Sequence, residues 1–320
     1  MAKKTARLFI AIAALAHAAP GWTDPPAVPF DQREVVDSLG RTVTYYISHP
    51  KEAKAPILLM IQGSGCDRII DMQKRRSTLY NFVPYAKEGR FTVVAVEKPF
   101  SGVVPDNVPG GTALSCSPEF NADFTAERWL SALRAALNDA RKSPQVDNRT
   151  TLVFGFSEGA VMADMLAGRD ESITDVIAMG GSGTTQLFDL VALAYRRCFD
   201  VSVCLAEIDG NVDKINANPE SSTEFAWGHP YKRWTSFFRV DPGDELLRSK
   251  ARIYIAFGTA DESVPALSEE HAIARLRLAG KPVTVRRVPN AGHTLSESSQ
   301  PDWDAMEKEY RTALDWFGKH

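Results

Sequence analysis

The chain has 320 residues, of which 44% are hydrophobic and 24% charged, and its formal net charge at pH 7 is −3. Because no basic stripe is present, nucleic acid is excluded as an expected partner. Roughly 300 residues follow the N-terminal segment, enough to bury a large core within a single α/β domain.

Residues 1–18 have the form of a secretory signal peptide. Basic side chains precede the apolar run Leu8–Ala16, and Ala16-His17-Ala18 has the small-x-small pattern of a cleavage site. The apolar run is about half as long as the roughly 20 residues of a membrane span. We expect cleavage near Ala18, which removes three basic side chains and takes the net charge from −3 to −6. The mature chain is then expected to be soluble, in the periplasm or secreted.

The remaining sequence predicts strands that alternate with helices. Residues 19–30 are rich in proline and alanine and predict an extended linker. Strands are predicted at residues 34–37 and 41–47 as an antiparallel pair, and then at 56–61, 91–96, 151–154, 173–179, 251–257 and 283–288. Helices are predicted at residues 71–88, 123–142, 160–168, 266–279 and 302–318. This alternation implies an α/β fold with a mostly parallel, eight-stranded sheet and helices on both faces.

One turn carries a chemical signal. The predicted strand 151–154 leads into Gly155-Phe156-Ser157-Glu158-Gly159, and a run of small and apolar residues that predicts a helix follows. This is the pattern of a nucleophile elbow, a turn so tight that the residues two before and two after the serine must be small. We therefore expect Ser157 in a strained backbone conformation, with its hydroxyl exposed above the sheet at a helix N-terminus.

Two later residues complete a set that suits nucleophilic catalysis. Asp261 follows the penultimate predicted strand, and His293 follows the last. Ligands of such sheets bind at the carboxyl ends of the strands, so Ser157, Asp261 and His293 are expected at the same edge. His293 would accept the serine proton, and Asp261 would hold the imidazole in the right tautomer. Glu262 is the alternative acid.

With these motifs the chain resembles the α/β-hydrolase superfamily over nearly all of the mature sequence. The matching segments are Gly155–Gly159, Gly258-Thr259-Ala260-Asp261 and Asn290-Ala291-Gly292-His293, in the order Ser, acid, His that the family uses. The chain is most similar to the dienelactone-hydrolase and prolyl-oligopeptidase-like branch. The resemblance implies a serine hydrolase that needs no metal and no organic cofactor.

The resemblance also implies an oxyanion hole. One donor would be the backbone N–H of Glu158, the residue after the nucleophile. The second would come from the loop Gln62–Gly65 after the first buried strand, and we favour the N–H of Ser64. The family often has His-Gly in this loop where the chain has Gln62, so the second donor stays open. The Glu158 side chain is expected at the surface, near a cation such as Lys98 or Arg68.

A segment of 67 residues breaks the alternation where many α/β-hydrolases carry a lid. The expected domains are the signal peptide (1–18), the hydrolase domain (19–183 and 251–320) and an inserted lid or cap (184–250). Arg196 and Arg197 suit either a solvated cap face or a site for a substrate carboxylate. The aromatic residues from Trp227 to Phe238 suit either a pocket lining or a small core under the cap.

Four cysteines in a chain expected to be exported suggest disulfide bonds. Three pairings are open, and the sequence alone does not choose among them. Cys198 and Cys204 are close in sequence and would close a small loop, while Cys66 and Cys116 would meet at one end of the sheet and brace the loop of Ser64. Buried free thiols are the alternative, and the spacings do not suggest a zinc site.

The sequence therefore predicts an exported serine hydrolase that cleaves a carboxylic ester of a small molecule through an acyl-enzyme. A serine peptidase or amidase with the same three residues is the nearest alternative, because the difference lies in the pocket and in leaving-group protonation. A non-catalytic binding protein on the same fold is the other alternative. The three residues argue against it, since a chain released from catalysis has no physical need for them.

Overall fold

The computed structural model describes residues 29–51, 54–69, 82–102, 104, 111–297 and 302–319. The predicted signal peptide, most of the predicted linker and residues 71–81 of a predicted helix lie outside these ranges. Among the helices that the structure describes, none is both long enough and apolar enough to cross a membrane.

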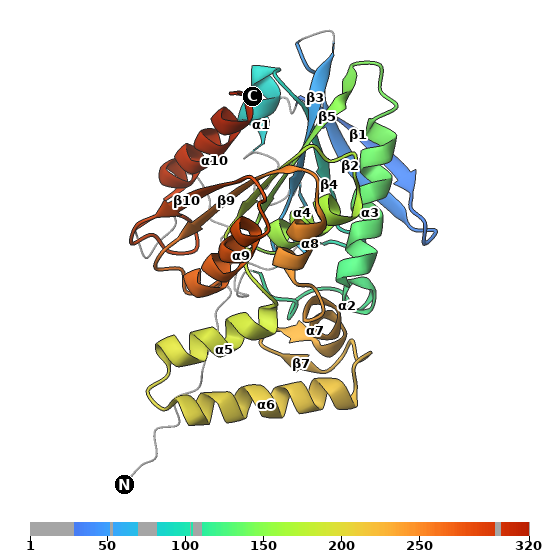
Figure 1. Ribbon diagram of the computed structural model, residues 1–320. Coiled ribbons are helices and arrows are strands. Elements are labelled where there is room, and N and C mark those ends of the chain that lie inside the picture. Colours follow the sequence, from blue (N-terminus) through green and yellow to red (C-terminus); the bar gives the residue numbers. More distant parts are fainter. Residues whose placement is uncertain are drawn as a thin grey trace.

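Eight strands form one sheet in the order β1-β2-β4-β3-β5-β6-β9-β10 (Figure 1). Their bounds are Phe30–Val36 (β1), Thr42–Ser48 (β2), Ala55–Ile61 (β3), Thr92–Val96 (β4), Val146–Phe156 (β5), Asp175–Met179 (β6), Arg252–Gly258 (β9) and Val283–Val288 (β10). β2 pairs antiparallel with β1 and β4, and the other pairings in this sheet are parallel. The predicted mostly parallel, eight-stranded sheet is confirmed.

Helices cover both faces of the sheet because its central strands are apolar on both sides. α3 (Ala126–Ala140), α4 (Glu158–Arg169), α8 (Pro242–Arg248) and α9 (Ala266–Leu278) pack on one face, and α1 (Val83–Glu88) and α10 (Trp303–Phe317) pack on the other. Along β3, Ile57 and Leu59 join the first core while Leu58 and Met60 join the second. Each such side chain contributes about 1.5–3 kcal/mol on full burial, so β3 firmly anchors the loop that follows it.

The cap stands at one end of the sheet (Figure 1). It consists of α5 (Gln186–Arg197), α6 (Val201–Ala217), the short strands β7 (Phe225–Ala226) and β8 (His229–Pro230), and α7 (Tyr231–Phe237). α5 and α6 pack around Leu190 and Ile208, and α7 adds a second apolar cluster around Trp234. α8, the last helix of the segment 184–250, packs instead on α4 in the helical layer of the sheet.

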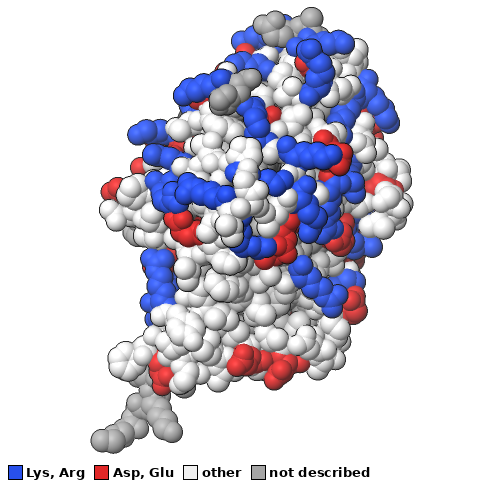
Figure 2. All heavy atoms as spheres, in the orientation of Figure 1, with Lys and Arg blue, Asp and Glu red and all other residues white. Residues whose placement is uncertain are grey.

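Charge is distributed unevenly between the two parts. Figure 2 shows Lys and Arg gathered over the sheet layers and mixed with Asp and Glu, whereas the cap carries little charge on the same face. The cap also exposes the large apolar side chains Tyr195, Phe199 and Val203. On this face the cap therefore presents a less charged and more apolar surface than the sheet layers do.

One predicted helix is wrong in its extent. The sequence predicts a single helix over 123–142, but the structure has α2 (Pro118–Asp123) and α3, separated at Phe124 and Thr125. Phe124 adopts an extended conformation, and Thr125 accepts a hydrogen bond from the N–H of Arg128 at 3.3 Å. This threonine is a helix N-cap, a signal that apolar periodicity alone does not detect.

Candidate active site

β5 ends in the turn that carries Ser157. This residue has φ 57° and ψ −127°, in a region that non-glycine residues seldom adopt. A Cβ at Gly155 would collide with the backbone of Gly159, and a Cβ at Gly159 would collide with the carbonyl group of Ile61 on β3. Close backbone approach therefore requires both glycines. Strained backbone of the kind seen at Ser157 is frequent at functional sites.

Ser157, His293 and Asp261 form one hydrogen-bonded line. His293 Nε2 lies 3.0 Å from Ser157 Oγ, and His293 Nδ1 lies 2.8 Å from Asp261 Oδ2. The three residues follow β5, β10 and β9, whose carboxyl ends lie at one edge of the sheet. Asp261 is fully buried, and the His293 side chain is 9% exposed. The structure thus brings the three predicted residues together at the predicted edge.

Asp261 is held in place by the loop after β9 and by the cap. Its Oδ1 accepts hydrogen bonds from the N–H groups of Ser263 and Val264 at 2.7 and 2.9 Å, which leaves Oδ2 for His293. Arg196 of α5 donates to the Asp261 carbonyl oxygen at 2.8 Å. Arg196 therefore binds the loop after β9, which carries Asp261.

Glu262, the alternative acid, is directed elsewhere. Its side chain is 65% exposed, and its carboxylate pairs with Arg197 at 3.2 Å. Together with the bond from Arg196 to Asp261, this ion pair ties α5 to the loop after β9. The two arginines thus connect the cap to the loop that orients His293.

The surroundings of His293 suit proton transfer. Burial alone would lower the pKa of its imidazole, but the charge of Asp261 and the hydrogen bond to it raise that pKa above the ordinary value of 6.5. A histidine between a hydroxyl and a buried carboxylate can take the hydroxyl proton, because the carboxylate stabilises the imidazolium that forms.

The expectation for the Glu158 side chain is wrong. Glu158 is only 3% exposed, and its carboxylate pairs with Lys98 at 2.9 Å and with Arg233 at 2.6 Å. Burial would raise the pKa of the Glu158 carboxyl, but the two cations lower it to about 2, so the group is ionised at neutral pH. Lys98 is one of the two expected cations, whereas the charge of Arg68 acts on Glu97.

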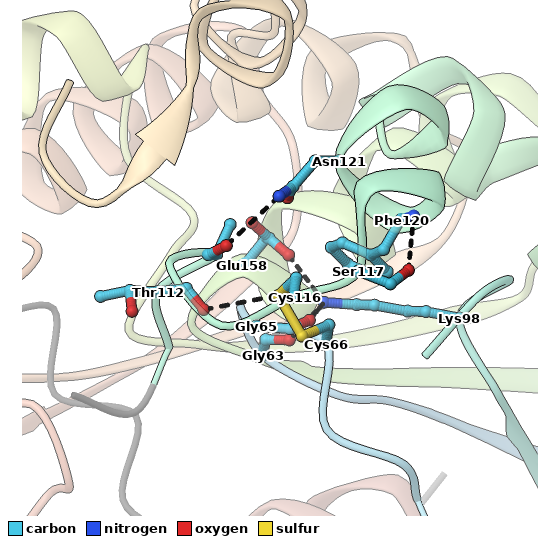
Figure 3. The surroundings of a disulfide bond; sticks show 11 residues. Gly63, Gly65, Cys66, Lys98, Thr112, Cys116, Ser117, Phe120, Asn121 and Glu158 are labelled. Carbon is cyan, nitrogen blue, oxygen red and sulfur yellow. Dashed lines mark hydrogen bonds and ion pairs between the residues drawn. A yellow bond between two sulfur atoms is a disulfide. The ribbon is translucent and has the colours of Figure 1, made fainter. Parts of the chain in front are cut away.

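The loop after β3 lies directly against the elbow. The position that a Cβ would take on Gly63 is 3.6 Å from the Cβ of Ser157. Lys98 Nζ donates to the carbonyl oxygens of Gly63 and Gly65 at 2.7 and 3.0 Å, and Figure 3 shows these bonds beside the one to Glu158. One ammonium group therefore holds this loop and the first residue of α4.

Both cysteine pairings favoured by the sequence are present. Cys66–Cys116 and Cys198–Cys204 are disulfides with Cα–Cα distances of 5.8 and 6.5 Å. No free cysteine occurs in the part of the chain that the structure describes. The first bridge joins the end of the loop 62–65 to the turn before α2 (Figure 3), and the second joins the end of α5 to α6.

A small cavity opens beside Ser157, with a volume of about 50 Å³. Its walls include Ser64 and Glu158 from the sheet side, and Asp189 and Trp234 from the cap. Burial and the nearby carboxylates of Asp261 and Asp241 raise the pKa of Asp189 to about 8, against a hydrogen bond from Ser268 that lowers it. No sequence pattern marks Asp189 or Arg233, because their place depends on how the cap packs on the sheet.

Comparisons with known proteins agree with this architecture. The family model described as "Prolyl oligopeptidase family" matches residues 130–320. Pyrococcus horikoshii acylaminoacyl peptidase aligns at 15% identity and TM-score 0.63 over 91% of this chain and 42% of that one. A Mycobacterium tuberculosis puromycin-hydrolyzing peptidase aligns at 12% identity and TM-score 0.61 over 92% of this chain and 40% of that one. A search of curated proteins finds no match.

A shorter protein aligns over its whole length. It is assigned as a dienelactone hydrolase in Klebsiella pneumoniae, and it matches at 16% identity and TM-score 0.59 over 91% of this chain and 99% of that one. The chain spans only 42% and 40% of the two peptidases, and identities this low establish the fold alone. The family match extends over more than half of the chain and contains Ser157, Asp261 and His293. The chain therefore belongs to the prolyl oligopeptidase family of serine hydrolases.

Proposed function

We propose that this serine hydrolase cleaves a carboxylic ester through an acyl-enzyme, with Ser157 as nucleophile, His293 as general acid and base, and Asp261 as the orienting acid. The observation that carries the proposal is the unbroken line of hydrogen bonds from Ser157 Oγ through His293 to Asp261, at 3.0 and 2.8 Å. Ser157, the first residue of this hydrogen-bonded series, has a strained backbone and borders a cavity, where a substrate carbonyl would have access to the hydroxyl.

The reaction proceeds in two halves. Ser157 Oγ attacks the ester carbonyl carbon while His293 Nε2 takes the hydroxyl proton. The tetrahedral intermediate then expels the alcohol, which receives that proton from His293. Water attacks the acyl-enzyme by the same route, so that the carboxylic acid leaves and the serine is restored. Throughout, Asp261 keeps Nδ1 protonated and Nε2 directed at the reacting atoms.

Two backbone N–H groups are proposed to bind the oxyanion. Glu158 begins α4, where the first N–H groups of a helix have no partner within the helix. Ser64 belongs to the loop that lies against the elbow, and both residues line the cavity beside Ser157. Loss of one such donor typically lowers kcat by about 10²–10³-fold.

The cavity favours a small acyl group. A water molecule needs about 10–15 Å³ of such volume, so the observed volume of about 50 Å³ accepts only a few non-hydrogen atoms. A serine peptidase or amidase is the second candidate, favoured by the match to the prolyl oligopeptidase family. A peptide would require the cap to move away from the elbow.

We also propose that the protein acts outside the cytoplasm. Two disulfides support this, because such bonds persist in oxidising compartments. The signal-peptide pattern of residues 1–18 points the same way.

The test combines active-site labelling with a substrate panel. Wild type, Ser157→Ala and His293→Ala, each checked for folding by circular dichroism, are treated with a fluorophosphonate probe. They are then assayed with p-nitrophenyl esters of increasing acyl length and with aminoacyl p-nitroanilides. We expect labelling of wild type alone and the highest kcat/KM with the shortest esters. Preference for the anilides would identify a peptidase or amidase, and folded wild type that neither labels nor turns over would favour a binding protein.

A further inference from the structure

We propose that Lys98 is a positioning residue for the oxyanion hole, whose buried ammonium fixes the two segments that carry the donor N–H groups. One segment is the loop that contains Ser64, and the other is the first turn of α4, which begins at Glu158. The inference rests on the proposed function, because it concerns the N–H groups assigned there to the oxyanion.

The bonds of Lys98 account for its whole donor capacity. Its side chain is buried, and Nζ donates to Gly63 O at 2.7 Å, to Gly65 O at 3.0 Å and to Glu158 Oε1 at 2.9 Å (Figure 3). An ammonium group has three N–H donors, so none is left for a substrate. The centroid of the Phe124 ring lies 4.6 Å from Nζ, so the ring also covers the ammonium group. Lys98 therefore acts through the groups that it binds.

The bond to Gly63 sets the direction of the Ser64 N–H. The Gly63 carbonyl and the Ser64 N–H belong to one peptide unit, which is planar and trans, so the two groups point in opposite directions. With the carbonyl held by Lys98, the N–H must point away from the ammonium. Ser64 lines the cavity beside Ser157. Glycines flank Ser64 on both sides and resist rotation of this peptide weakly, which is why an outside contact is needed.

The same ammonium fixes the other donor-bearing segment through its ion pair with Glu158. Arg233 of α7 binds the second carboxylate oxygen at 2.6 Å and also donates to Gln186 of α5 at 2.6 Å. Glu158 is thus held between a cation that follows a sheet strand and a cation of the cap. Groups that are fixed before the reaction starts need not reorganise when the oxyanion forms.

A purely structural ion pair makes a different prediction. Lys98→Met leaves Glu158 paired with Arg233, so no buried charge loses its last partner. Under a structural role the variant would lose stability while each folded molecule kept its normal kcat. Under the proposed role each folded molecule turns over more slowly, because the two donors are no longer held toward the carbonyl oxygen.

The experiment compares Lys98→Met and Lys98→Gln with wild type and with a matched control. Arg252→Met is the control, because it removes a cation that pairs with the buried carboxylate of Asp175 at 2.5 Å. Arg252 begins β9 and Asp175 begins β6, so this ion pair lies at the opposite edge of the sheet from Ser157. Active sites are counted by prolonged fluorophosphonate labelling. The kcat and KM for p-nitrophenyl acetate are then measured beside the Ki of a trifluoromethyl ketone, which forms an oxyanion on the serine.

For Lys98→Met we expect kcat per labelled site to fall about 10–100-fold, less than the full loss of a donor, with KM changed by no more than about threefold. The Ki of the ketone should rise by the same factor as kcat falls. Lys98→Gln should lie between this variant and wild type, because an amide still donates to the loop carbonyls. Arg252→Met should lose stability and keep its kcat.

Unchanged kcat and Ki in Lys98→Met would overturn the inference and leave the proposed function standing. If that variant does not fold, Lys98→Gln carries the comparison, and wild-type values there would overturn it equally. Folded wild type that fails to label would overturn the proposed function, and the inference with it.

Discussion

The two disulfides should contribute unequally to stability. They join cysteines separated by 50 residues in Cys66–Cys116 and by 6 residues in Cys198–Cys204. In the chain-entropy treatment, a cross-link lowers the conformational entropy of the unfolded chain by about 2.1 + 1.5R ln n cal/mol/K, where n is the number of residues in the closed loop. At 25 °C this gives about 4 kcal/mol for the longer loop and about 2 kcal/mol for the shorter one.

The bridges should also differ in their effect on turnover. Cys66 directly follows the loop whose carbonyl groups bind Lys98, whereas Cys198 and Cys204 join two cap helices. We expect Cys66→Ser/Cys116→Ser to lose about tenfold in kcat, less than the 10²-fold that a 1 Å misplacement can cost. The pair Cys198→Ser/Cys204→Ser should keep kcat within about twofold of wild type.

Double variants are the right comparison because they leave no unpaired thiol from the broken bridge. Guanidinium unfolding followed by circular dichroism measures the free energies, and kcat is divided by the concentration of labelled sites. Equal losses of stability, or a larger loss at Cys198–Cys204, would refute the loop-length reasoning. A fully folded cap variant that lost as much turnover as the Cys66–Cys116 variant would refute the separation of the two effects.

Two further predictions concern pH. His293 must be neutral to accept a proton, and its pKa is raised, so the acid limb of kcat/KM should have its midpoint above pH 6.5. Asp261→Asn should move this midpoint to lower pH and reduce kcat by up to about 10⁴-fold. A midpoint that does not move in the pH–rate profile of the variant would contradict this. The pKa of Asp189 is raised from 3.8 to about 8, so its contribution to stability is complete below pH 3.8 and is lost as pH rises through 8. Asp189→Asn should lessen the loss of unfolding free energy between pH 5 and pH 9 by on the order of 4 kcal/mol, because each pKa unit between pH 5 and the folded pKa of about 8 corresponds to about 1.4 kcal/mol. An unchanged pH dependence in denaturant titrations would count against this.

The sequence predicts those features of the fold that depend on contacts between neighbouring residues. The glycines of the elbow are required by contacts within a few residues and with β3. The apolar runs predicted the sheet because burial on both faces leaves a strand no polar side. The placement of Ser157, Asp261 and His293 then followed from the parallel sheet, whose strands bring their carboxyl ends to one edge. Their catalytic roles stay a prediction.

Contacts between residues far apart along the chain are not predictable from local sequence patterns. Lys98 and Arg233 lie 60 and 75 positions from Glu158 along the chain, on opposite sides of it. No local pattern signals that an acid at the elbow will be buried between them, and a glutamate at the start of a helix is normally a surface residue that favours the helix dipole. The burial of Asp189 depends in the same way on where α5 packs.

The pairing of Glu158 has a consequence for how the cap is understood. Burying a lone carboxylate costs several kcal/mol, and removing one partner of a buried pair typically costs about 3–5 kcal/mol. One partner of Glu158, Lys98, follows β4 in the sheet, and the other, Arg233, belongs to α7 in the cap. A cap that only covered the site would not need to supply a cation to Glu158, the residue after Ser157. The cap is therefore part of the structure that holds the elbow, and substitutions at its base should affect chemistry as well as substrate access.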